Sequence, residues 1–218
     1  MYMADKLNES LILKTLDWAY EKALTQNLPG LDSAFTLAEE YLKQEGSLEE
    51  KIDSLIRWQN TKAASWGFLT GLGGVVVIPV TLPSNIAGVS FLQIRMIAAI
   101  AIMNGYDVHD ERVKTMVLAC LCGSAGAEIL KKAGVNLGTK VLHNVIQNIS
   151  KETIMRLNKA IGLSLLSKFW GKSVINFGKA VPLLGGIIGG AFDGITTNAI
   201  GDIAKKAFLK NIKETNVT

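Results

Sequence analysis

The sequence contains few of the residues that build metal and redox sites. Its 218 residues include only two cysteines, Cys120 and Cys122, and two histidines, His109 and His143. The cysteines are too close together for a mutual disulfide, and neither belongs to a CxxC motif or a Cys/His group. We therefore expect no metal site and no cofactor.

Charge is also scarce. Charged residues make up 19% of the chain and hydrophobic residues 49%, against about 25% charged residues in typical soluble domains. The mean hydropathy of +0.27 lies between the values of soluble proteins and of multi-span transporters. A membrane-associated protein with soluble parts fits this balance.

The net charge of +4 is small and dispersed. It does not indicate nucleic-acid binding, for which a basic stripe with interleaved aromatics is typical. Four lysines near the C-terminus could instead face an anionic membrane: Lys205, Lys206, Lys210 and Lys213. An equally good interpretation is that they complement the dipole at a helix C-terminus.

The N-terminal residues 1–62 predict amphipathic helices. Leu13, Leu16 and Tyr20 recur at helical spacing, and Ser47 with Glu50 forms a capping-box pattern before the third helix. We interpret residues 1–62 as a helical appendage wrapped on residues 63–208, within a single domain of residues 1–218. The first residues do not have the pattern of a secretory signal, so a reducing cytoplasmic compartment is expected.

Residues 63–94 contain no charged side chain. A run of about 20 such residues can cross a bilayer, but Pro79 and Pro83 interrupt this one. The pattern predicts an apolar helix that runs through Trp66 to about Ile78, a break, and a second helix over 85–104. Two half-length helices suit a re-entrant or interfacial hairpin, and they suit the centre of a soluble helical fold equally well.

A second apolar block spans residues 174–208 and carries two overlaid GxxxG patterns after Pro182, formed by Gly185, Gly186, Gly189 and Gly190. Glycines at this spacing let two helices approach closely. A homodimer and an intramolecular helix pair both explain them. Because sustained apolar–polar alternation is absent, we predict an all-α multi-helix bundle with central glycine-rich apolar helices and amphipathic N-terminal helices.

Many short motifs in this order resemble the bacterial EcsC family. They are the run from Trp66 to Gly74, Leu82-Pro83, Gln93-Ile-Arg95, Ile100-Ala101, Gly105-Tyr-Asp107, Lys131, Lys168-Phe169, Lys179, Pro182, Gly185-Gly186, Gly189-Gly190, Phe192-Asp193, Gly201, Ala204 and Phe208. The resemblance covers nearly the whole chain. It implies a helical bacterial protein associated with membranes, from a family named after a gene beside a transporter operon, and it supplies no reaction or cofactor.

Polar residues in apolar surroundings are the candidate site. Arg95 lies mid-helix and requires an acidic or carbonyl partner, because an unpaired buried guanidinium is very costly. Asp193 has the same problem with the opposite sign. We hypothesise that the two lie close together, with Gln93 and Asn198 completing the hydrogen bonds. This cluster is either a structural ion pair or a cleft that binds a head group or another anion.

Three functions fit these observations. The first is a membrane-associated accessory protein at the inner face of the cell membrane, peripheral or partly inserted, which assists a transporter or an envelope process. Its partners would be membrane lipid and a membrane protein complex. The second is a soluble helical module that binds an apolar or anionic ligand. The third is an enzyme acting on lipid, for which no catalytic motif is found.

Overall fold

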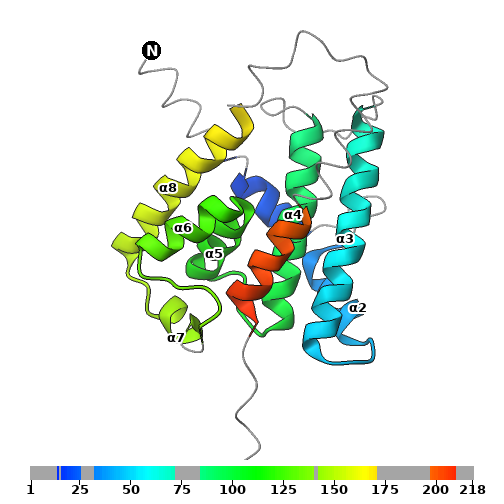
Figure 1. Cartoon of the computed structure of the whole chain (residues 1–218), viewed down its shortest axis with the longest axis horizontal. Helices are drawn as coiled ribbons and strands as arrows, with labels where there is room; N and C mark the ends of the chain where they lie inside the picture. Colours follow the sequence, from blue (N-terminus) through cyan, green and yellow to red (C-terminus); the bar gives the residue numbers. More distant parts are fainter. Residues whose placement is uncertain are drawn as a thin grey trace, which may run out of the picture.

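The computed structural model describes residues 14, 16–25, 32–71, 84–139, 142–170 and 197–209. Within these ranges the regular structure is entirely helical, which confirms the prediction of an all-α protein (Figure 1). The labelled helices are α2 (Ala34–Leu42), α3 (Leu48–Gly71), α4 (Ser84–Met103), α5 (Glu111–Leu121), α6 (Ser124–Lys132), α7 (Leu142–Gln147) and α8 (Lys151–Trp170). Residues 16–25 and 197–208 are also helical.

The N-terminal helices begin where the sequence indicates. The backbone amide of Thr36 donates to the side chain of Ser33, which caps α2. Before α3, the amide of Ser47 donates to the Glu50 carboxylate at 2.7 Å, and the amide of Glu50 donates back to the Ser47 hydroxyl at 3.3 Å. This reciprocal pair is the predicted capping box, and it satisfies two amides that the helix leaves free.

Helix α4 forms the centre of the bundle. Every side chain over residues 90–101 is buried, because α2, α3 and α5 all pack against this helix. Its sequence has no polar face, as expected for a helix that is surrounded on all sides. The helix ends at Met103, and Gly105, two residues later, adopts a φ of +72° that favours glycine.

The second half of the described chain packs beside α4. Helix α5 lies between α4 and the pair α6 and α8, and α8 forms an outer edge of the molecule (Figure 1). Helices α5 and α6 approach so closely that a Cβ at Gly126 would lie 1.8 Å from the carbonyl oxygen of Ala119. Glycine is therefore required at this crossing.

Helix α3 does not stop where the composition changes. It continues as one helix of 24 residues from Leu48 to Gly71, whereas the sequence predicts two helices for these residues, an amphipathic one and an apolar one that runs through Trp66. Lys62, the last residue of the predicted appendage, thus lies inside a helix. The predicted proline break, the GxxxG block and the rest of the apolar stretch to residue 83 lie outside the described residues.

Among the described residues, no helix combines the length and the apolar character that crossing a membrane requires.

Candidate functional site

Arg95 is the largest fully buried side chain of the described core. Its Nη1 donates to the backbone carbonyl of Asp32 at 2.8 Å, and its Nη2 donates to the side-chain oxygen of Gln59 at 2.7 Å. The guanidinium thus links α4 to α3 and to the residue that precedes the Ser33 cap. Both observed partners are carbonyl oxygens, which is one of the two kinds of partner that the sequence predicts.

The charge of Arg95 carries a desolvation cost. Burial lowers the pKa of Arg95, and the nearby charges of Asp32 and Glu40 oppose this shift. Within the described residues, Arg95 Nε and Gln59 Nε2 have no hydrogen-bond partner. Because the Arg95 side chain is not exposed to solvent, its hydrogen bonds form a cross-link inside the described core.

Of the other members of the predicted cluster, Gln93 and Asn198 lie among the described residues. The side-chain amide of Gln93 donates to the hydroxyl of Thr197 at 3.0 Å, and both side chains are buried. Asn198 is exposed, so its predicted place in the buried cluster is wrong: Thr197, one residue earlier, faces the core instead. Asp193 lies outside the described residues, and its contact with Arg95 stays a prediction.

The C-terminal lysines also differ from one another. Lys205 forms ion pairs with Glu49 at 2.9 Å and Asp53 at 2.7 Å, which attach the helix of residues 197–208 to the first turns of α3. Lys206 is exposed and remains a candidate lipid-facing residue. Lys210 and Lys213 lie outside the described residues.

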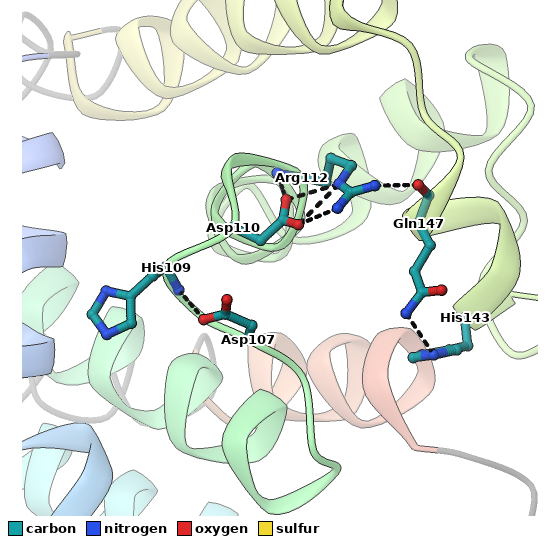
Figure 2. A network of polar contacts seen from close by, with 6 residues as sticks. All are labelled: Asp107, His109, Asp110, Arg112, His143 and Gln147. Carbon is teal, nitrogen blue, oxygen red and sulfur yellow. Dashed lines mark hydrogen bonds and ion pairs between the residues drawn. The ribbon is translucent and has the colours of Figure 1, made fainter.

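A polar network joins the start of α5 to α7 (Figure 2). The carboxylate of Asp110 caps α5 and accepts hydrogen bonds from the guanidinium of Arg112. Arg112 also donates to the backbone carbonyl of Gln147, whose side-chain nitrogen lies 3.0 Å from His143 Nε2. The contact between Arg112 and Gln147 joins the start of α5 to the end of α7. The other contacts lie within one helix or its cap, so the network has a structural role.

The histidines and cysteines of the described chain are not arranged for nucleophilic catalysis. The backbone amide of His109 donates a hydrogen bond to the carboxylate of Asp107 (Figure 2). The His109 ring stacks on Phe35, with 5.9 Å between the ring centroids. Cys120 is fully buried, and burial raises the pKa of its thiol, so the thiolate nucleophile is disfavoured. No group of side chains suited to a metal ion occurs among the described residues.

A basic hollow of about 320 Å³ lies between α6 and α8. Its polar lining comes from Lys132 at the end of α6 and from Thr153 and Arg156 on α8. Ile129 and Leu157 contribute apolar surface. The site therefore places one cation on each helix beside an apolar floor.

The outer face of α8 continues from this hollow. Met155 is 68% exposed and Leu163 is 48% exposed, and Lys159 lies four residues from each. Residues four apart share a helix face, so two apolar side chains flank a cation. Among the exposed side chains of α6 and residues 151–160, cations outnumber carboxylates by five to two. The cations are Lys131, Lys132, Lys151, Arg156 and Lys159, and the carboxylates are Glu128 and Glu152.

Comparison with known families decides the affiliation of the chain. The model of the EcsC protein family matches residues 9–210. The chain belongs to the EcsC protein family. No curated protein and no solved structure matches it.

The basic hollow of this EcsC family member was not predicted from the sequence. Lys132 and Arg156 are 24 positions apart, and each looks like an ordinary solvated lysine or arginine on an amphipathic helix. The only local signal was the Lys131-Lys132 pair at the end of α6, which the helix dipole explains equally well. The crossing of α6 and α8 brings the two cations together.

Proposed function

We propose that this EcsC family member is an accessory protein that docks on an anionic membrane surface through the outer face of α8 and the adjoining end of α6. The observation that carries the proposal is the exposure of Met155 and Leu163 beside a surplus of cations. We place it at the inner face of the cell membrane, where it assists a transporter or another envelope process.

The charge and the apolar side chains of this face act together. Each lysine or arginine near an anionic leaflet contributes about 1 kcal/mol of attraction. Exposed Met155 and Leu163 can enter the boundary between head groups and acyl chains, while Lys159 stays level with the lipid phosphates. Neither contribution is large alone, so docking should need both anionic lipid and the two apolar side chains.

An accessory role fits the described side chains better than a catalytic one. Hydrolysis of a lipid needs a nucleophile beside a base, or a metal-bound water. The thiol of Cys120 is buried and the ring of His109 stacks on Phe35. These residues support the fold.

Flotation with vesicles tests the proposal. The full chain should float with vesicles of phosphatidylcholine and phosphatidylglycerol, and much less with phosphatidylcholine alone. Leu163→Asn should weaken flotation, because it removes an apolar side chain from the docking face. The matched control is Leu42→Asn: Leu42 is 42% exposed and lies on α2, on the other side of the molecule from α8 (Figure 1).

A second pair of variants separates location from net charge. Lys151→Glu with Lys159→Glu reverses two cations on the docking face, and Lys43→Glu with Arg57→Glu reverses two exposed cations elsewhere. Both double variants have the same net charge. Equal loss of flotation in the two would refute docking through α8, and absence of flotation by the unaltered chain would favour a soluble binding module.

A further inference from the structure

We infer that the basic hollow between α6 and α8 binds one phosphate group, that of an anionic lipid head group. This inference rests on the proposed function, because it names what the docked protein recognises at the membrane surface. The hollow opens beside the exposed face of α8 that carries Met155. A lipid bound there would lie at the contact between protein and bilayer.

The side chains of the hollow suit a phosphate. Arg156 and Lys132 approach from different helices, and a guanidinium with an ammonium can share the charge of one phosphate between them. Arginine can bind two phosphate oxygens through parallel donors, which gives geometric selectivity as well as energy. The hydroxyl of Thr153 lies 3.2 Å from that of Ser150, and when it accepts from Ser150 it can donate to a phosphate beside Arg156.

The remaining lining suits the part of a lipid next to its phosphate. The hollow is also lined by the aliphatic side chains of Ile129, Leu157 and Ala160. This apolar floor offers a contact for a glycerol backbone. A volume of about 320 Å³ lies at the small end of ligand sites, which span about 300–1,000 Å³. The hollow therefore fits a head group and not a whole lipid.

Glu152 places a negative charge near the hollow. It precedes Arg156 by four residues on α8, so the two side chains share a helix face. The carboxylate should therefore repel a phosphate bound at Arg156, and removing it should relieve this repulsion. Glu152→Gln is therefore expected to strengthen binding, which a loss of folding could not produce.

Titration with soluble short-chain lipid tests the inference. Dihexanoyl phosphatidylglycerol, below its micelle concentration, should give saturable shifts at α6 and α8 in heteronuclear NMR spectra. Arg156→Gln should weaken binding about tenfold or more, since a charge-assisted hydrogen bond contributes about 1.5–3 kcal/mol. Arg57→Gln, at an exposed position on α3, should change the affinity less than about twofold.

Glycerol phosphate distinguishes the two sources of the phosphate. Tighter binding of the short-chain lipid than of glycerol phosphate would support a lipid ligand, and equal affinity would assign the hollow to soluble phosphate esters and overturn the lipid assignment. Stronger binding by Glu152→Gln, but not by Glu45→Gln at an exposed position before α3, would support the role of Arg156.

The two proposals fail in different ways. If the unaltered chain floats with anionic vesicles but shows no saturable shifts with the short-chain lipid, the phosphate site is refuted and docking stands. If the titration saturates at the hollow and flotation is absent, docking is refuted and the hollow is a site for a dissolved ligand.

Discussion

The guanidinium of Arg95 on α4 donates a hydrogen bond of 2.7 Å to the side-chain oxygen of Gln59 on α3, and neither side chain is exposed to solvent. Because this buried charge has few hydrogen-bond partners, each partner contributes substantially to the stability of the fold. Removing one of the two side chains leaves the other with a buried polar group that has no hydrogen-bond partner. Removing both side chains leaves fewer buried polar groups without a partner.

A double-mutant cycle should reveal this coupling. Gln59→Leu alone should lower the free energy of unfolding by about 1.5–3 kcal/mol, because it leaves Arg95 Nη2 without an acceptor. Arg95→Met alone should also destabilise, because it leaves Gln59 and the Asp32 carbonyl unpaired. The double variant should cost at least about 1 kcal/mol less than the two single losses together. Urea unfolding measures all four proteins, and additive losses would contradict the coupling.

Gly126 should not tolerate even the smallest side chain. Gly126→Ala would place a Cβ against the backbone carbonyl of Ala119, and backbone cannot rotate away as a flexible side chain can. We expect a loss of about 1–3 kcal/mol or more in the free energy of unfolding. Ala125→Ser, at an exposed position in the same helix, should change it by less than about 0.5 kcal/mol. Equal urea midpoints for Gly126→Ala and the unaltered chain would show that the helices can separate without cost.

Acid should remove the contribution of the capping box before α3. Hydrogen bonds from the backbone amide and then the hydroxyl of Ser47 lower the pKa of Glu50 below its ordinary value of 4.5. A carboxyl with a lowered folded-state pKa stabilises the protein above its unfolded pKa, and the stabilisation is lost as the pH falls through the folded value. Glu50→Gln should therefore lower the Tm at pH 7 and leave it unchanged well below the folded pKa.

Thermal unfolding across this pH range, followed by circular dichroism, checks the expectation. Glu45→Gln is the control, because the carboxylate of Glu45 takes no part in the capping box. A difference between Glu50→Gln and the unaltered chain that stays constant from neutral to acid pH would show that the charge of Glu50 contributes nothing.

Local features of this fold could be predicted from the sequence, and contacts between distant residues could not. The capping box needs only Ser47 and Glu50, three residues apart, so its geometry follows from the helix itself. Arg95 was recognised as a buried cation in need of a partner. Its partners Asp32 and Gln59 lie 63 and 36 positions away, and a backbone carbonyl carries no signature in a sequence.

The sequence predicts that Asn198 lies in the buried cluster, whereas Thr197 lies there, and this error shows a second limit of prediction from sequence. Successive residues on a helix differ in direction by about 100°, so an error of one position moves a side chain from the core to solvent. Both residues are small and polar, and composition alone does not distinguish them. Only the packing of residues 197–208 against its neighbours determines which one meets Gln93.

The continuity of α3 has a practical meaning for anyone who wishes to divide the protein. The change in composition at Lys62 invites a cut between a polar first part and an apolar second part, yet α3 runs through it from Leu48 to Gly71. A cut there would sever the helix, and the second fragment would expose to water the side chains of α4 that α2 and α3 cover. Such a fragment would aggregate whatever its affinity for lipid, so sedimentation with membranes is informative only for the intact chain.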